Sequence, residues 1–397
     1  MFHKKITWPV IIATAALAVG HMGAAVAGSR EQAKRIHDRL AGVPPSASVL
    51  NTMEADIAGA DVLTAANRAM DNDAFYNVTL KNFATPWTNR ELTVFAPLND
   101  YTATVIGMIR DDVDFRQVLY ADILYVGNDS LGLTPYAMTN NTHYEELEAA
   151  GTSLRTGLVQ TTQSTKMDIP AAATAGVMTT RGGASAFFYA GTNRAMLRFT
   201  LLNHLCNDLE QLKDTTRSPD RIRQDVSRSP GGDSRIFLNA CVGCHAGMDP
   251  LAQAFAYYEF DDVLGRMVYN DVGTINPDTG TRVQSKYHIN ADNFRYGYVT
   301  TNDNWDNYWR AGANGFLGWD NSLPGSGSGA KSMGMELAHS AAFAQCQVKK
   351  VFKTVCLRDP VDAADRTQIS DMVTSFRNNG YRMKRVFAEA ADYCKGG

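Results

Sequence analysis

Two cysteines and a histidine stand together past the middle of the chain. Cys241 and Cys244 are separated by two residues, and His245 follows directly. This C-x-x-C-H spacing is that of covalent haem attachment. Two thiols on one helical turn can reach the two vinyl groups of a porphyrin, and the adjacent imidazole then lies below the iron. The motif therefore predicts one covalently bound haem c, with His245 as an axial iron ligand.

Other uses of a close cysteine pair fit this sequence less well. A redox-active C-x-x-C requires a thioredoxin-like βαβ setting, which the surrounding residues do not predict. A zinc site requires a second pair of ligands at short spacing, and the sequence has none. A disulfide between Cys241 and Cys244 themselves is geometrically poor. Haem attachment is the preferred interpretation.

The second axial ligand decides what such a haem does, because two protein ligands favour electron transfer and an open position allows chemistry at the iron. Met335 is the preferred candidate and Met333 the next, since both follow a glycine-rich stretch and precede a helix. His288 is the histidine alternative. Met248 is too close to His245 in sequence, so we expect it to be a packing residue. Core packing is the competing interpretation of both Met333 and Met335.

Arg266 is the arginine chosen as a partner for the haem propionates. A guanidinium group binds a carboxylate through two parallel hydrogen bonds, which suits a propionate. Arg235 and Arg310 offer the same chemistry. An ordinary ion pair is the competing interpretation for each of the three.

The first residues predict export. Lys4 and Lys5 precede an apolar stretch over 6–19, and small residues lead up to Ala27. That order is typical of a secretory signal peptide, here residues 1–27. The apolar stretch is shorter than the roughly 20 residues that span a bilayer, which disfavours a membrane anchor. The mature chain is therefore expected to be soluble, without a membrane span, and periplasmic or otherwise exported.

The net charge of the chain limits the kinds of partner that it is expected to bind. The formal net charge is -3 at pH 7, which is no reason to expect binding to nucleic acid or to an anionic membrane. The expected partners are exported redox proteins.

Four further cysteines are dispersed along the chain. Cys206, Cys346, Cys356 and Cys394 allow up to two disulfides in an oxidising compartment, with three possible pairings. Cys346 and Cys356 are too far apart to pair on one straight helix, so that bond would need a turn between them. Pairing of Cys356 with Cys394 is a plausible alternative. The sequence leaves the choice open.

The spacing of apolar residues predicts mostly helices. Periodic apolar positions indicate helices over 115–125, 192–212 and 334–357. Asp362, just after a proline, is the expected N-cap of a further helix. The fold class expected is mainly α, with helical domains around a C-x-x-C-H haem-binding module and with loop-rich and short β insertions.

Proline and glycine divide the chain further. The Asp-Pro pair at 249–250 is expected to end the haem helix, and the Gly-Ser run over 325–329 is expected to be a flexible loop. The regions expected are a signal peptide (1–27), an N-terminal helical domain (28–150), an extended crossing segment (151–190), a haem c-binding helical region (191–265), a loop-rich Tyr/Asn/Gly segment (266–333) and a C-terminal helical region (334–397).

The residues after the motif form a series: Asp249-Pro250, then Tyr258-Glu259-Phe260-Asp261-Asp262, then Gly265-Arg266. This series resembles the haem-binding module of the planctomycete-type cytochrome c family. The resemblance is specific over 241–266 and loose over 30–395. It implies an exported haem protein with flanking helical domains and does not imply a particular reaction. The chain departs from the family in the segment before the motif, where Ser-Pro pairs at 218–219 and 229–230 among charged residues replace a proline-rich stretch, so it would be a divergent member.

Three functions remain open at this point. The first is a single-haem c-type cytochrome that carries electrons between exported partners. The second is a haem enzyme, peroxidase-like or oxidising a small substrate, with an open distal site and a base from residues 285–310. The third is a haem subunit of an exported complex. The chain is several times longer than one haem requires, yet it has no hydrolytic motif or dinucleotide-binding glycine pattern, and electron carriage is preferred.

Overall fold

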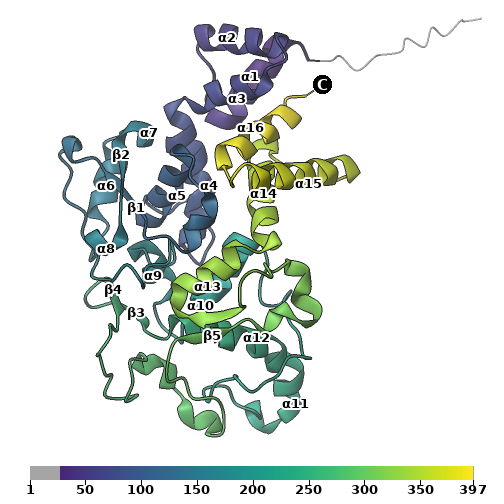
Figure 1. Ribbon diagram of the computed structural model, residues 1–397. Helices are drawn as coiled ribbons and strands as arrows, with labels where there is room; N and C mark the ends of the chain where they lie inside the picture. The colour runs from purple at the N-terminus through teal and green to yellow at the C-terminus, as the bar shows by residue number, and fades with distance from the viewer. Residues whose placement is uncertain (1–26, 397) are drawn as a thin grey trace, which may run out of the picture.

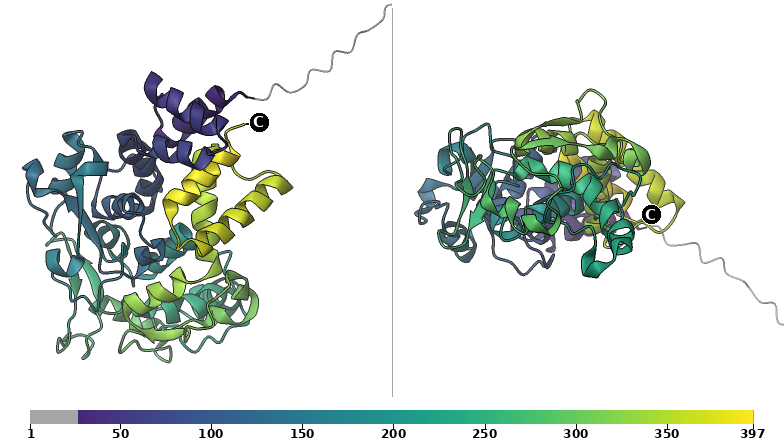
Figure 2. Two further views of the ribbon diagram at one scale, coloured as in Figure 1. Left: turned by 45° about the horizontal axis from the view of Figure 1, so that its top comes forward. Right: turned by 90° about the horizontal axis from the view of Figure 1, so that it is seen from below.

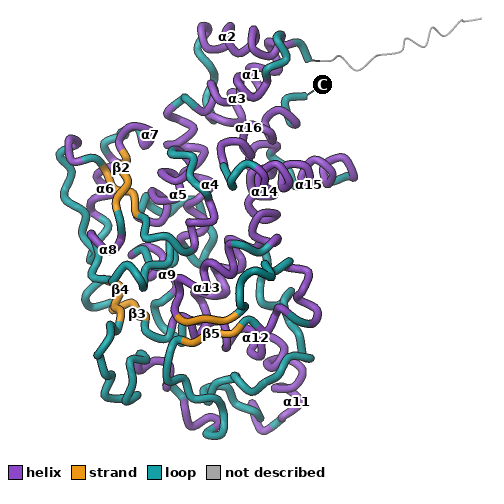
Figure 3. Tube along the Cα trace, in the orientation of Figure 1, coloured by secondary structure: helices purple, strands orange, loops and turns teal. Residues whose placement is uncertain are grey.

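The computed structural model describes residues 27–396, so the predicted signal peptide lies outside the described residues except for Ala27. The described chain is mainly helical, with three small two-stranded antiparallel sheets (Figures 1 and 3), which confirms the predicted fold class at this level. The helices are α1 (Ser29–Ala41), α2 (Ala47–Ala58), α3 (Val62–Met70), α4 (Lys81–Ala84), α5 (Asp100–Arg110), α6 (Thr142–Ala149), α7 (Leu154–Gly157), α8 (Gln163–Lys166), α9 (Arg181–Phe187), α10 (Arg194–Thr200), α11 (Ser234–Ile236), α12 (Val242–Ala252), α13 (Gly329–Ala338), α14 (Ala341–Cys356), α15 (Ala363–Asn378) and α16 (Met383–Tyr393). The strand pairs are β1 (Leu124–Gly127) with β2 (Leu158–Thr161), β3 (Tyr258–Asp261) with β4 (Arg266–Tyr269), and β5 (Asn304–Asp306) with β6 (Ser326–Ser328).

The two ends of the described chain pack side by side. Helices α1 and α3 contact α16, and α14 to α16 pack on one another. Figures 1 and 2 show the N-terminal helices, in purple, and the C-terminal helices, in yellow, next to one another.

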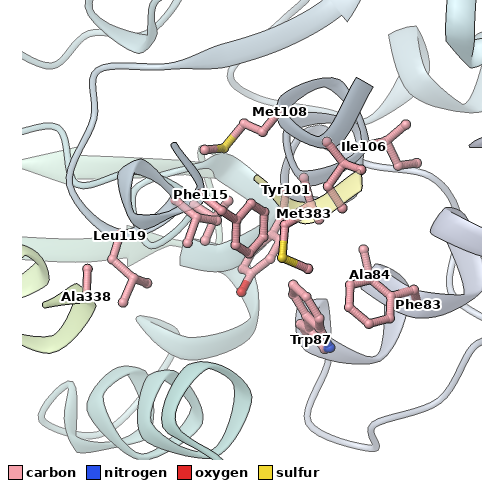
Figure 4. Close-up of a cluster of buried hydrophobic side chains, with 14 of the residues drawn as sticks. Phe83, Ala84, Trp87, Tyr101, Ile106, Met108, Phe115, Leu119, Ala338 and Met383 are labelled. Atoms are coloured by element: carbon pink, nitrogen blue, oxygen red, sulfur yellow. The ribbon is translucent and has the colours of Figure 1, made fainter. Parts of the chain in front are cut away.

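One hydrophobic core extends through most of the described chain. It includes Ala33 of α1 and Ala391 of α16, together with Phe255 just after α12. Figure 4 shows a part of this core, where side chains such as Phe83 and Tyr101 gather beside Met383. The end of the predicted haem helix is therefore packed into the same core as the terminal helices.

The predicted helix over 115–125 is wrong in its second half. A short 3₁₀ turn spans Phe115–Leu119, and β1 (Leu124–Gly127) then pairs with β2. All four residues of β1 are buried, so the segment has no polar face. A short, wholly apolar run does not distinguish a helix from a strand, and here pairing with β2 decides for the strand.

The other predicted helices form, with different ends. The helix over 192–212 continues α10 through a π-helical turn but ends at Cys206, whose φ of 55° is left-handed. The helix over 334–357 is divided into α13 and α14 at Ser340, whose side chain accepts a hydrogen bond from the backbone of α14. Asp362 caps α15, which confirms that prediction.

The glycine-rich segment over 325–329 is not the flexible loop that its composition indicates. Ser326–Ser328 form β6, paired with β5. A Cβ atom on Gly327 would lie 2.9 Å from Ser332 Oγ and 3.1 Å from the Trp305 ring. Gly327 therefore permits close packing on an indole.

The four dispersed cysteines form two disulfides. Cys206 bonds Cys346, and Cys356 bonds Cys394. Cys346 and Cys356 both lie on α14, which is why they do not pair with each other. The pairing of Cys356 with Cys394 is confirmed, and the two bonds are consistent with an oxidising compartment.

We expect the Cys206–Cys346 bond to make a large contribution to stability, because it joins residues 140 positions apart. The Cys206→Ala/Cys346→Ala variant should lower the free energy of unfolding by about 4 kcal/mol, mainly through a less constrained unfolded chain. Urea unfolding under non-reducing conditions measures this loss. An unchanged unfolding midpoint, with an unchanged slope, would contradict the prediction.

Candidate haem-attachment site

The C-x-x-C-H residues lie where a π-helical turn joins α12. Asp233 accepts a hydrogen bond from the backbone N–H of Arg235 and so starts a helical segment with α11. A π-helical turn, Phe237–Cys241, follows, and α12 begins at the next residue. Cys241 is thus the last residue of the wider turn, and Cys244 and His245 lie in the first turn of α12. Turns of this kind inside α-helices often occur at functional sites.

A small apolar cluster lies under this junction, separate from the main core. Cys241 packs on it, and its buried members are Ile222, Val226, Phe237, Val242 and Ala246. Two apolar neighbours on the lead-in segment stay exposed, Ile236 at 46% and Leu238 at 57%. The motif therefore lies at a partly uncovered apolar surface.

Both cysteines of the motif are free thiols, unlike the four others of the chain. Each is half-buried, and Cys244 Sγ donates a weak hydrogen bond to the carbonyl of Leu209 at 3.6 Å. Burial, with a smaller effect of Glu210, raises the pKa of the Cys244 thiol. A redox-active C-x-x-C thiol has a lowered pKa instead. The Cys244 thiol therefore lacks this property of a disulfide-exchanging cysteine.

The imidazole of His245 is held by a carboxylate one turn further along α12. Its Nδ1 lies 3.2 Å from Asp249 Oδ1. An ionised carboxylate can only accept, so Nδ1 carries a proton, and in the neutral ring the lone pair is on Nε2. No residue within 27–396 forms a hydrogen bond with Nε2. This is the arrangement of a histidine ligand, in which one ring nitrogen binds the metal and the other donates to a carboxylate or carbonyl.

Asp249 is fully buried and ionised. Arg194 donates to both of its oxygens, from Nε at 2.6 Å and from Nη2 at 2.9 Å. The backbone N–H of Arg223 donates to Oδ2 at 3.2 Å. Burial opposes ionisation, but the charges of Arg194 and Arg223 and the bonds from His245 and Arg194 outweigh it and hold the pKa of Asp249 well below its usual range.

Two further charges complete the group around Asp249. Asp225 accepts hydrogen bonds from Nη1 and Nη2 of Arg194, at 2.6 and 2.9 Å. The Arg223 side chain is buried, donates to Thr192 Oγ1 at 2.7 Å and lies over the ring of Tyr287. Two guanidinium groups thus face two carboxylates, and the charge of a third, Arg228, also acts on both carboxylates.

Helix α12 packs closely on an indole through a glycine. A Cβ atom on Gly247 would lie 2.0 Å from Nε1 of Trp309, whose side chain is fully buried. The helix also continues through Pro250 to Ala252, so the prediction that the Asp-Pro pair ends it is wrong. Met248 is buried in the main core, as its position predicted.

The Gly247→Ala variant should be strongly destabilised. Its methyl group cannot fit unless Trp309 or the helix moves, which should cost about 3 kcal/mol of unfolding free energy. Gly243→Ala, one turn earlier on α12, is the matched control: a Cβ atom there would lie 2.5 Å from Cγ of Lys213, a side chain that can move more easily than a buried indole. Urea unfolding of both variants measures the difference. Equal stability of the two variants would contradict the close contact.

The structure places the other predicted ligands in different surroundings. Met333 is fully buried in the main core, and Met335 is 37% exposed. Both belong to α13, which packs on β5, as α12 also does (Figure 1). The Nε2–H of His288 donates to the carbonyl of Thr300 at 3.1 Å, so only Nδ1 remains free for a metal. The second axial ligand therefore stays a prediction.

Arg266 is not brought to the motif. It lies on β4, where its guanidinium contacts Met138 Sδ at 3.7 Å and Asp168 at 3.5 Å. Figure 1 shows β4 at the left of the lower part of the molecule, beside β3 and away from α12. The other two arginines are paired with acids of their own, Arg235 with Asp233 and Arg310 with Glu336.

The charged group that holds His245 was not predicted from the sequence. Asp249 could have been found, because a carboxylate four positions after a histidine shares its face on a helix. Arg194 lies 55 positions away from Asp249 and has no such signal. Two free thiols beside an imidazole with an available Nε2 are a donor set that fits haem c.

Comparisons of the chain with protein-family models, with curated proteins and with solved structures found no match. The interpretation of the site rests on its own residues.

Proposed function

We propose that this chain is an exported c-type cytochrome that carries one haem and transfers single electrons between exported redox proteins. The observation that carries the proposal is His245, whose Nδ1–H is held by buried Asp249 and whose Nε2 is available. Cys241 and Cys244 would form the two thioether bonds, since they are the free thiols of the chain. The haem would supply an iron that changes its charge by one electron.

The protein residues would hold the haem and set its surroundings. The thioether bonds would keep the haem on α12 without a deep pocket. Ile236 and Leu238 offer apolar surface beside the attachment site. The charged group around Asp249 fixes the ring of His245. Of the predicted second ligands, Met335 remains preferred, with Met333 and His288 as alternatives.

Export is supported by two observations. The sequence predicts a signal peptide over residues 1–27, and the described chain contains two disulfides. Among the described helices none combines the length and the apolar character that a bilayer crossing needs.

A haem enzyme is the second candidate, and the carboxylate on His245 favours it. A carboxylate acceptor makes the imidazole a stronger donor, and a strong donor ligand on the proximal side promotes cleavage of bound peroxide. This function requires that neither Met335, Met333 nor His288 occupies the sixth position.

Spectroscopy of the exported protein tests both candidates. The full-length chain, expressed with the haem-attachment machinery, should gain the mass of one haem and show the absorption bands of haem c. If it is an electron carrier, carbon monoxide should leave the spectrum of the reduced protein unchanged. Rapid binding of carbon monoxide would favour the enzyme, and a colourless protein of unmodified mass would contradict both candidates.

A further inference from the structure

The hydrogen-bond acceptor of His245 is the carboxylate of Asp249. A ligand histidine can donate its second N–H to water, to a backbone carbonyl or to a carboxylate, and the carboxylate is the strongest acceptor of the three. Here Nδ1 lies 3.2 Å from Asp249 Oδ1. The ring therefore donates to a full negative charge.

Asp249 cannot easily turn away from the ring. Its oxygens accept from Nε and Nη2 of Arg194 at 2.6 and 2.9 Å, and its side chain is fully buried. Turning the carboxylate would break these bonds in a place where water cannot replace them. The acceptor is thus fixed in position before any ligand binds.

The charged groups around Asp249 limit the distance over which its negative charge acts. Arg194, Arg223 and, farther away, Arg228 offset the negative charges of Asp249 and Asp225, so much of the field of either carboxylate is cancelled within the group. An influence on a bound iron must then pass mainly through the hydrogen bond to His245. Partial transfer of the Nδ1 proton towards Asp249 gives the ring more negative charge, which stabilises the oxidised, more positive iron.

We propose that Asp249 is a positioning residue that strengthens His245 as an iron ligand and thereby favours the ferric state of the haem. This inference rests on the haem proposed above. It assigns to the group of Asp249, Arg194 and Asp225 a function in setting the redox potential of the protein, in addition to its structural contribution.

The Asp249→Asn variant of the haem-loaded protein tests the inference. Asparagine has nearly the same shape but no charge, so the ring becomes a weaker donor. At a fixed solution potential, the ratio of reduced to oxidised haem should rise about tenfold, which corresponds to about 59 mV for one electron. A spectroscopic redox titration measures the ratio.

The Asp225→Asn variant is the matched control. It removes the same charge from the same arginine, but Asp225 has no hydrogen bond to His245. We expect its ratio to change by less than about twofold. An equal change in both variants would overturn the inference in favour of a general field effect, and an unchanged ratio in Asp249→Asn with full haem content would overturn it directly.

A measurement on the unsubstituted protein covers the case in which Asp249→Asn does not fold or takes up no haem. In the reduced, low-spin protein labelled with ¹⁵N-histidine, the Nδ1–H of His245 should exchange slowly with solvent, because its acceptor is buried. Exchange as fast as that of an exposed histidine would overturn the inference. An unsubstituted protein without haem would instead contradict the proposed function.

Discussion

Replacing both Cys241 and Cys244 by alanine should abolish covalent haem attachment. A c-type haem is bound through thioether bonds to these two sulfur atoms, and the remaining cysteines are occupied in disulfides. After denaturation and extraction with acidified organic solvent, the unsubstituted chain should retain its haem and the double variant should retain none. Mass spectrometry and a haem stain of a denaturing gel measure the difference.

The Cys356→Ala/Cys394→Ala variant is the control for this experiment. It also removes two sulfur atoms, but from a disulfide that joins α14 to the end of α16. It should lose stability and keep its haem. Covalent haem in the Cys241→Ala/Cys244→Ala variant would contradict the assignment of the attachment site.

Replacing Arg194 by alanine should destabilise the fold by about 3–5 kcal/mol, because it leaves the buried carboxylates of Asp249 and Asp225 without their main partner. Arg198→Ala is the matched control on the same helix. Arg198 also donates two hydrogen bonds to a carboxylate, that of Asp208, but its side chain is 48% exposed. Removing an exposed pair should cost less than about 1 kcal/mol.

Urea unfolding of both variants at neutral pH measures these costs without any need for haem. A similar, small loss for Arg194→Ala and Arg198→Ala would show that the group around Asp249 is solvated rather than buried. That result would also remove the reason to regard His245 as held in place. The two experiments are independent, since one tests the attachment of the haem and the other the support of its ligand.

The sequence by itself determined the features that depend on local spacing. Cys241, Cys244 and His245 lie within five residues, so the backbone of one helical segment brings them together whatever the rest of the fold. Asp362 at the start of α15 is a local feature of the same kind. The mainly α class also followed from local periodicity.

Only the tertiary structure decided the features that depend on distant partners. Arg194, Asp225 and Asp249 come from three separate segments, and no local pattern requires their charges to meet. In the same way, residues 124–127 form a strand because β2 lies beside them. Position 327 needs a glycine because the ring of Trp305, 22 positions earlier in the chain, packs closely on its backbone. Local spacing specifies which chemistry a segment can perform. Long-range packing specifies which charges surround it, because the energy of a buried charge depends on partners that only the folded chain brings within hydrogen-bonding distance.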